Sequence, residues 1–402
     1  MPTPAVTSAR SRTFTESVIR EMTRVAQQHG AINLAQGFPD FPMPAAMKDA
    51  ACAAIHGDVN QYAVTWGTPA LRLAIAEKYR RWYGLEVDPD REVTVACGAT
   101  EAMAATFLAL VDPGDEVVAF SPFYENYGPD AVLAGATPVY VPLEPPNGPP
   151  NADGGAWRID EGRLRAALAR RPKALVLNTP HNPTGKVFTR AELDLVAGLV
   201  QEFDVPWVFT DEIYEHIVYA GHHHVLAAWP GMRERVVTVS GLSKTFSCTG
   251  WRLGYAVAPP SATGAIRKVH DFLTVGAPAP LQAAGAVGLA FGADYYNQLA
   301  AGYRARREVL CGALGDAGFT FAPPDGAYYV VAGYEAHSRD DDRPFAEWLA
   351  REVGVATVPV SSFLPPDEGA GSRAVRFAFC KRTETLERAA ERLTAMAGAG
   401  RA

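Results

Sequence analysis

The stretch that decides the fold is Trp207-Val-Phe-Thr-Asp-Glu-Ile-Tyr214, an apolar run followed directly by a carboxylate and a phenol. Two other apolar runs end in a similar way: Ala174-Leu-Val-Leu177 leads into Asn182, and Val236-Val-Thr-Val239 leads into Lys244. Successive runs lie about one strand–helix–strand unit apart, which predicts parallel strands whose ends meet at one edge of a sheet. That edge would gather a carboxylate, a phenol, an amide and a lysine.

The composition is that of an ordinary globular enzyme. Of 402 residues, 48% are apolar and 20% are charged, and the net charge of −7 gives no electrostatic reason to expect binding to nucleic acid or to an anionic membrane. The five cysteines are scattered without metal or disulfide spacing, which predicts reduced, buried thiols. No run approaches the ~20 apolar residues of a membrane span, and the N-terminus does not resemble a signal peptide. We therefore expect a soluble, cytoplasmic protein.

The order of the predicted elements indicates an α/β protein of two domains. Residues 14–29 have the pattern of an amphipathic helix, and from Lys173 to Pro259 buried strands alternate with helices, as in a mostly parallel sheet covered on both faces. A long helical stretch over about 295–314 is followed by strand patterns at 327–331, 355–358 and 374–378. We expect an N-terminal segment that packs on the small domain, a large domain and a small C-terminal domain, with bounds 1–44, 45–290 and 291–402.

The side chains at the predicted sheet edge suit a pyridine aldehyde that carries a phosphate. An amine such as that of Lys244 can form an imine with an aldehyde once desolvation has lowered its pKa; the alternative is a solvated surface lysine. Asp211 would pair with a protonated pyridine nitrogen and keep the ring an electron sink, unless it caps a helix or forms a structural ion pair. Tyr214 and Asn182 could both hydrogen-bond the ring oxygen of the cofactor.

The sequence also predicts an anion site. Gly98-Ala99-Thr100 opens a helix directly after a strand, and free backbone N–H groups at such a helix start attract phosphate. Ser243 and Arg252 would complete the phosphate site, although an ordinary salt bridge is the alternative for Arg252. Tyr124 follows another strand and could stack on an aromatic ring or pack in the core.

Arg376 stands inside the apolar strand pattern Val375-Arg376-Phe377. A buried guanidinium needs an anionic partner, and the α-carboxylate of a substrate would suit it as well as a structural ion pair would. His222-His223-His224 suggests a metal site at first sight. We expect an exposed turn and no metal there, because adjacent histidines do not share one face and no carboxylate has ligand spacing.

In these motifs the sequence resembles the class I aminotransferases of pyridoxal phosphate (PLP) fold type I. Within them it is most similar to the branch of kynurenine, glutamine–phenylpyruvate, methionine and succinyldiaminopimelate aminotransferases. The resemblance runs from about residue 14 to 397. The matching stretches are Asn33–Pro42, Asn60–Tyr62, Gly98–Glu101, Asn178–Gly185, Thr210–Tyr214 and Ser243–Gly254.

The resemblance implies a large domain with a mostly parallel seven-stranded sheet and a smaller α/β domain. It implies that Lys244 carries PLP as an imine, that Asp211, Tyr214, Asn182 and Tyr124 contact the ring, and that Ala99, Thr100, Ser243 and Arg252 hold the phosphate. Tyr62 would reach the phosphate of a second subunit, which implies a homodimer with shared active sites. Arg376, Asn182 and the backbone at Gly37 would bind the substrate carboxylate.

The sequence departs from the family pattern at several positions. Relatives carry serine where this chain has Gly241, beside Ser240, so either position could stand at the phosphate. Aromatic or histidine side chains of the kynurenine enzymes are replaced by Ile19, Thr100, Val275 and Gly276.

The predicted reaction is transfer of an amino group from an L-amino acid (methionine, aromatic or glutamine-like) to a 2-oxo acid by a ping-pong mechanism. Alternatives are a cysteine-S-conjugate β-lyase, a succinyldiaminopimelate-type aminotransferase and, more remotely, a PLP-sensing regulatory module.

Overall fold

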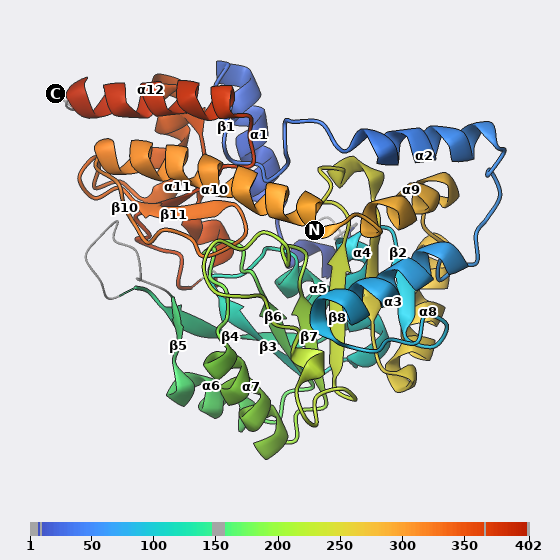
Figure 1. Ribbon diagram of the computed structural model, residues 1–402. Helices are drawn as coiled ribbons and strands as arrows, with labels where there is room; N and C mark the ends of the chain where they lie inside the picture. Colours follow the sequence, from blue (N-terminus) through green and yellow to red (C-terminus); the bar gives the residue numbers. More distant parts are fainter. Residues whose placement is uncertain (1–6, 9, 147–156, 366, 400–402) are drawn as a thin grey trace, which may run out of the picture.

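In the computed structural model, which describes residues 7–8, 10–146, 157–365 and 367–399, the main element is an eight-stranded sheet (Figure 1). Its strand order is β2-β9-β8-β7-β6-β3-β4-β5, and the pairs β4–β3, β3–β6, β6–β7 and β7–β8 are parallel. The strands are β2 (Val93–Ala96), β3 (Glu116–Ser121), β4 (Thr137–Glu144), β5 (Arg158–Ile159), β6 (Ala174–Asn178), β7 (Trp207–Asp211), β8 (Val236–Gly241) and β9 (Gly254–Val257). The predicted mostly parallel sheet is confirmed, with one more strand than the expected seven: β5, two residues long, pairs antiparallel with β4 at the edge.

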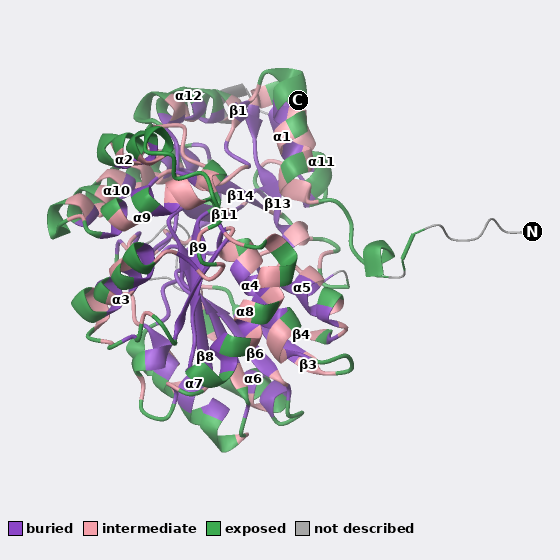
Figure 2. Ribbon diagram, turned by 90° about the vertical axis from the view of Figure 1, so that its right-hand side faces the viewer, coloured by how far each residue is buried: buried purple, intermediate pink, exposed green. Residues whose placement is uncertain are grey.

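Helices cover both faces of this sheet, as the continuous burial of its central strands requires (Figure 2). One hydrophobic core lies under α2 (Ala45–His56), α3 (Pro69–Tyr83), α6 (Glu161–Leu168), α7 (Arg190–Glu202) and α9 (Ala279–Leu289). The other lies under α4 (Ala99–Leu110), α5 (Tyr127–Ala134) and α8 (Pro260–Thr274). Short 3-10 turns are η1 (Arg10–Arg12), η2 (Leu226–Ala228), η3 (Thr249–Trp251) and η5 (Val360–Phe363).

A further core joins the beginning and the end of the chain. Its sheet has the order β10-β11-β14-β13, all antiparallel, and a separate parallel pair joins β1 to β12. These strands are β1 (Ile32–Asn33), β10 (Thr320–Phe321), β11 (Tyr329–Gly333), β12 (Val355–Ala356), β13 (Val358–Pro359) and β14 (Ala374–Ala378). The helices beside them are α1 (Val18–His29), α10 (Ala293–Asp316), α11 (Asp342–Trp348), the π-helix η4 (Leu349–Val353) and α12 (Thr383–Ala399).

The structure differs from the sequence prediction in local details. The first long helix begins at Val18 rather than at residue 14, and the single strand expected over 355–358 is divided into two short strands. None of the five cysteines forms a disulfide, and Cys248 and Cys380 are buried. Cys97 and Cys311 are only partly buried and Cys52 is exposed, so the expectation of burial is wrong for Cys52 and holds only in part for the other two. Within the described residues, no helix is both long and apolar enough to span a lipid bilayer.

Candidate active site

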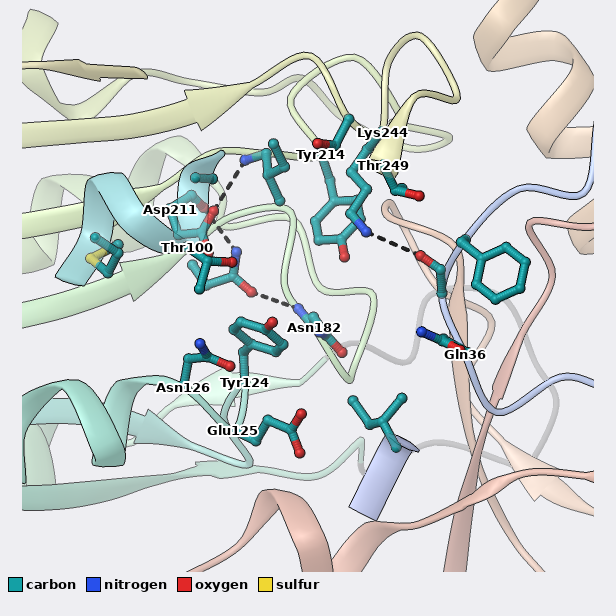
Figure 3. A pocket seen from close by; sticks show the side chains of 18 of the residues that line it. Gln36, Thr100, Tyr124, Glu125, Asn126, Asn182, Asp211, Tyr214, Lys244 and Thr249 are labelled. Atoms are coloured by element: carbon teal, nitrogen blue, oxygen red, sulfur yellow. Dashed lines mark hydrogen bonds between the residues drawn. The ribbon is translucent and has the colours of Figure 1, made fainter. Parts of the chain in front are cut away.

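A cavity of about 440 Å³ opens at the ends of the parallel strands, where the large sheet meets the core that joins the beginning and the end of the chain (Figure 3). Its walls come from the ends of β6, β7 and β8, the start of α4, the segment Gln36–Phe38 and strand β14. Eleven of the residues predicted from the sequence line it: Gly37, Ala99, Thr100, Tyr124, Asn182, Asp211, Tyr214, Ser243, Lys244, Arg252 and Arg376. Tyr62 does not line this cavity and is 86% exposed.

The Lys244 amine enters the cavity just past the end of β8 (Figure 3). Its Nζ donates a hydrogen bond to the carbonyl oxygen of Gly37 at 3.0 Å and has no carboxylate partner among the described residues. Burial lowers the pKa of Lys244 to about 8, and the positive charge of Arg252 acts in the same direction. The amine therefore carries a neutral fraction near neutral pH, as a nucleophile needs.

Asp211 ends β7 and is 8% exposed. Its Oδ2 accepts a hydrogen bond from the Tyr127 hydroxyl at 2.8 Å, and the Asn178 side-chain amide donates to the Asp211 carbonyl oxygen at 2.8 Å. Burial raises the pKa of Asp211 to about 6, because no cation hydrogen-bonds this carboxylate among the described residues. Such a group favours a positively charged ligand atom at its free face.

Arg376 is completely buried on β14, yet it has no carboxylate partner in the described part of the chain. Its Nη1 donates to Asn182 Oδ1 at 2.9 Å and its Nη2 donates to the Ala35 carbonyl at 2.7 Å, while Nε has no partner. The guanidinium lies between the rings of Tyr329 and Phe363, 4.3 and 4.6 Å from their centroids. A buried cation without an anion indicates a carboxylate ligand that the protein does not supply itself.

The anion site lies at the start of α4. Gly98 has φ +89°, and a Cβ there would come within 2.4 Å of Arg252 Nη2, so the glycine lets the guanidinium approach the helix start. The buried Ser243 lines the same cavity. Ser240 does not, because its hydroxyl points away and donates to Glu215 Oε1 at 2.7 Å.

The three adjacent histidines are not all on an exposed turn, so that prediction is wrong. The His223 side chain is 3% exposed, and its Nε2 lies 2.9 Å from Glu212 Oε2. Glu212, Glu215 and His223 offer ligand atoms within 4.8 Å of one another. The cluster does not suit a metal ion, because the Lys78 ammonium already binds Glu215 and brings a positive charge into it.

Comparison with known proteins identifies the family. The family model described as "Aminotransferase class I and II" matches residues 29–393. The chain belongs to this family. The solved N-succinyldiaminopimelate aminotransferase of Mycobacterium tuberculosis is 40% identical with a TM-score of 0.92, over 97% of this chain and all of that one. The methionine aminotransferase of Escherichia coli is 38% identical over 97% of this chain and 98% of its own length, and human kynurenine–oxoglutarate transaminase 1 is 37% identical over 93% and 94%.

The protein is therefore a PLP-dependent aminotransferase of the class I and II family. The side chains fit this cofactor: an amine of lowered pKa in Lys244, a buried carboxylate without a cation in Asp211, and a glycine-opened helix start beside Arg252. These three features lie around one cavity.

The sequence interpretation missed several lining residues. Tyr127 and Asn178 both hold Asp211, and the Tyr329 hydroxyl lies 3.0 Å from that of Tyr214. Tyr127 stands in a stretch where Tyr124 was named, but the sequence gives no signal for which tyrosine faces the carboxylate. Asn178 could have been found, since it ends the strand whose partner residue in the β6–β7 register is Asp211.

Proposed function

We propose that Lys244 is the residue that holds PLP covalently and moves the proton, with Asp211 at the pyridine nitrogen. Tyr214 and Asn182 would contact the ring oxygen and Tyr124 the ring face. Support comes from their shared cavity and from the fact that neither Lys244 nor Asp211 forms an ion pair with another described residue. We assign the phosphate to the backbone of Ala99 and Thr100, to Ser243 and to Arg252.

The observation that carries the substrate assignment is the buried guanidinium of Arg376, which has no carboxylate partner among the residues that the structure describes. It can bind an α-carboxylate through Nε and its free N–H groups, while Asn182 keeps it oriented. The backbone at Gly37 would close the site from the other side, where Tyr328 Oη also donates to the Gly37 carbonyl at 2.9 Å. We propose that this one carboxylate site serves both the amino donor and the 2-oxo acid, as a ping-pong reaction requires.

PLP supplies the aldehyde that takes up the amino group and a ring that draws electrons away from Cα. The Lys244 amine would accept the proton from the substrate Cα and deliver it to the carbon that receives it, acting first as general base and then as general acid. The carboxylate of Asp211, held by the Tyr127 hydroxyl, would stabilise a positive charge on the ring nitrogen. The Tyr214 hydroxyl lies 3.0 Å from that of Tyr329, and this contact would hold the phenol of Tyr214 in place beside the ring oxygen.

We propose that the amino donor is an L-amino acid of the methionine, aromatic or glutamine-like group. The names of the relatives span methionine, kynurenine and a succinylated diamino acid, so the family leaves the choice open. A half-reaction screen tests the proposal: each amino acid is added without acceptor, and the visible absorbance of bound PLP is followed. Conversion by none of these donors would refute it, and Arg376→Lys should raise the donor concentration needed for half-conversion.

We also propose a homodimer with shared active sites. Exposed apolar side chains gather in one patch, defined here as the dimer patch: Tyr62, Val64, Phe272, Leu273 and Val275, with Phe272 93% exposed. The two segments are neighbours, because His270 Nε2 lies 2.9 Å from the Thr65 carbonyl oxygen. The patch adjoins the phosphate end of the cavity, since Cys97 Sγ lies 3.6 Å from the carbonyl oxygen of Gly276.

Mixing two inactive variants tests the shared site. Tyr62→Ala lacks the residue that we expect to reach across, and Lys244→Ala lacks the amine. A mixed dimer would contain one site with both defects and one intact site, so refolding the variants together should restore part of the activity. No recovery, or a monomer in sedimentation, would refute the shared site.

The division of the chain at 1–44, 45–290 and 291–402 remains a proposal. It is supported by the core that joins the first and last parts of the chain. The cytoplasmic location inferred from cysteine use stays a prediction.

A further inference from the structure

Four basic side chains are among the described residues that line the cavity: Arg20, Lys244, Arg252 and Arg376. The proposed function assigns the last three to the cofactor aldehyde, the phosphate and the α-carboxylate. Arg20 is left without a role. It lies in the first turn of α1 and is exposed where it lines the cavity.

The Arg20 guanidinium makes no hydrogen bond or ion pair with any residue that the structure describes. The carboxylates around it are engaged elsewhere. Glu16 binds Arg24 through two bonds of 2.6 and 3.0 Å, and Glu21 binds Arg343 at 2.7 Å. Arg20 is therefore free to bind an anion that enters the cavity.

The neighbouring polar groups favour a carboxylate on the substrate. The Gln36 side chain accepts a hydrogen bond from Thr23 Oγ1 at 3.0 Å through its oxygen, which leaves its amide N–H groups as donors. Glu125 is already held by the Ser17 hydroxyl at 2.5 Å. Gln36 and Glu125 both line the cavity and lie apart from each other in it (Figure 3). A ligand carboxylate in this part of the cavity would find donors on Arg20 and Gln36, and the charge of Glu125 would oppose its binding.

We propose that Arg20 binds a second carboxylate at the far end of the substrate, so that the enzyme selects a dicarboxylic 2-oxo acid as amino-group acceptor. The inference rests on the proposed function of the cavity, in which Arg376 binds the first carboxylate. A single cation at each end gives two charge-assisted contacts to one dicarboxylate, and a monocarboxylic acceptor makes only the contact with Arg376.

Kinetics with two matched acceptors test this. In Arg20→Gln, kcat/KM for 2-oxoglutarate should fall about tenfold or more through KM, the usual effect of losing a charge-assisted hydrogen bond at a partly solvated site. For 2-oxopentanoate, which lacks only the second carboxylate, kcat/KM should change less than about twofold. Arg20→Lys should recover part of the loss, because it restores the charge without the planar fork.

Arg24→Gln is the matched control. It removes the same charge from the same helix, but Arg24 forms an ion pair with Glu16 and does not line the cavity. It should leave both acceptors within about twofold, which separates a direct contact from a general change of potential. Glu125→Gln should have the opposite sign to Arg20→Gln and lower KM for 2-oxoglutarate.

Binding of glutarate, a dicarboxylate that cannot react, gives a readout that does not require turnover. Calorimetry with the holoenzyme should show about tenfold weaker glutarate binding in Arg20→Gln and unchanged binding in Arg24→Gln. An equal loss for both acceptors in Arg20→Gln, or no loss for 2-oxoglutarate and glutarate, would overturn the role of Arg20. Turnover with 2-oxopentanoate in the same variant shows whether the proposed function itself still holds.

Discussion

Behind the cavity, the large sheet buries an ion pair whose loss should be costly. Lys78 on α3 binds Glu215, and the two residues are 2% and 5% exposed. Glu215 also accepts hydrogen bonds from Tyr83 and Ser240, both at 2.7 Å, and Lys78 donates to Tyr255 at 2.9 Å. Lys78→Met keeps the volume but leaves a buried carboxylate without its cation, which should cost about 3–5 kcal/mol of unfolding free energy.

The expected loss of unfolding free energy corresponds to a decrease in the melting temperature, Tm. Unfolding entropy is about 2.1 cal/mol/K per residue, so a chain of 402 residues that unfolds as one unit should lose roughly 4–6 °C in Tm. Scanning calorimetry measures this directly. The control is Arg80→Gln on the same helix, which breaks the pair with Glu77; those side chains are 56% and 54% exposed, so the loss should stay below about 1 kcal/mol.

Two further results would distinguish pairing from simple loss of packing. Lys78→Met combined with Glu215→Gln should be more stable than Lys78→Met alone, because the amide no longer needs a cation. Equal shifts in Lys78→Met and Arg80→Gln would refute the reasoning.

The pH dependence of the pair has a definite sign. In the wild type, the ammonium of Lys78 and its hydrogen bond outweigh burial and hold the pKa of Glu215 at about 2, below its ordinary value of 4.5. This stabilisation is complete above the unfolded pKa and is lost as pH falls toward about 2. Without Lys78, burial should raise the pKa of Glu215 instead, so the deficit of Lys78→Met should shrink between pH 7 and pH 5.

Three other changes test the cavity. Asp211→Asn should raise the dissociation constant of PLP by roughly 10–100-fold through loss of a charge-assisted contact, measured by equilibrium dialysis; an unchanged constant would contradict its assignment to the ring nitrogen. Gly37→Ala would place Cβ 2.0 Å from the Tyr329 hydroxyl, so the backbone or the ring must shift, and KM for the substrates should rise. Because burial lowers the pKa of Lys244 to about 8, its acylation in the apoprotein should rise with a midpoint near pH 8, whereas a midpoint near the ordinary ~10.4 would show a solvated amine.

The sequence predicted the strand-end part of the cavity because parallel strands leave little freedom. In the β6–β7 register Asn178 pairs with Asp211, and in the β7–β8 register Asp211 pairs with Val239, so residues just past these strand ends must meet. That Asp211 and Lys244 lie near each other could thus be predicted from the strand order alone.

The sequence could not predict contacts that depend on how helices and turns pack. Tyr127 reaches Asp211 from the first turn of α5, and His223 reaches Glu212 across eleven residues of irregular chain. Neither contact follows a helical or strand period, so the sequence carries no pattern for it. The prediction of an exposed turn at His223 was wrong for this reason. It used only the spacing of the histidines along the turn, whereas His223 contacts the buried carboxylate of Glu212.

The contacts in the cavity and the contacts in the buried network of Lys78 and His223 come from one short turn, residues 211–215. Asp211 and Tyr214 line the cavity, while Glu212 and Glu215, each one residue later, enter the buried network of His223 and Lys78. Residues three apart in such a turn point in similar directions, so the pair Asp211 and Tyr214 and the pair Glu212 and Glu215 face different sides. We therefore expect the buried contacts of Glu212 and Glu215 to hold Asp211 and Tyr214 in position. A substitution that breaks the network should displace Asp211 and Tyr214 together, and should weaken PLP binding as well as the fold.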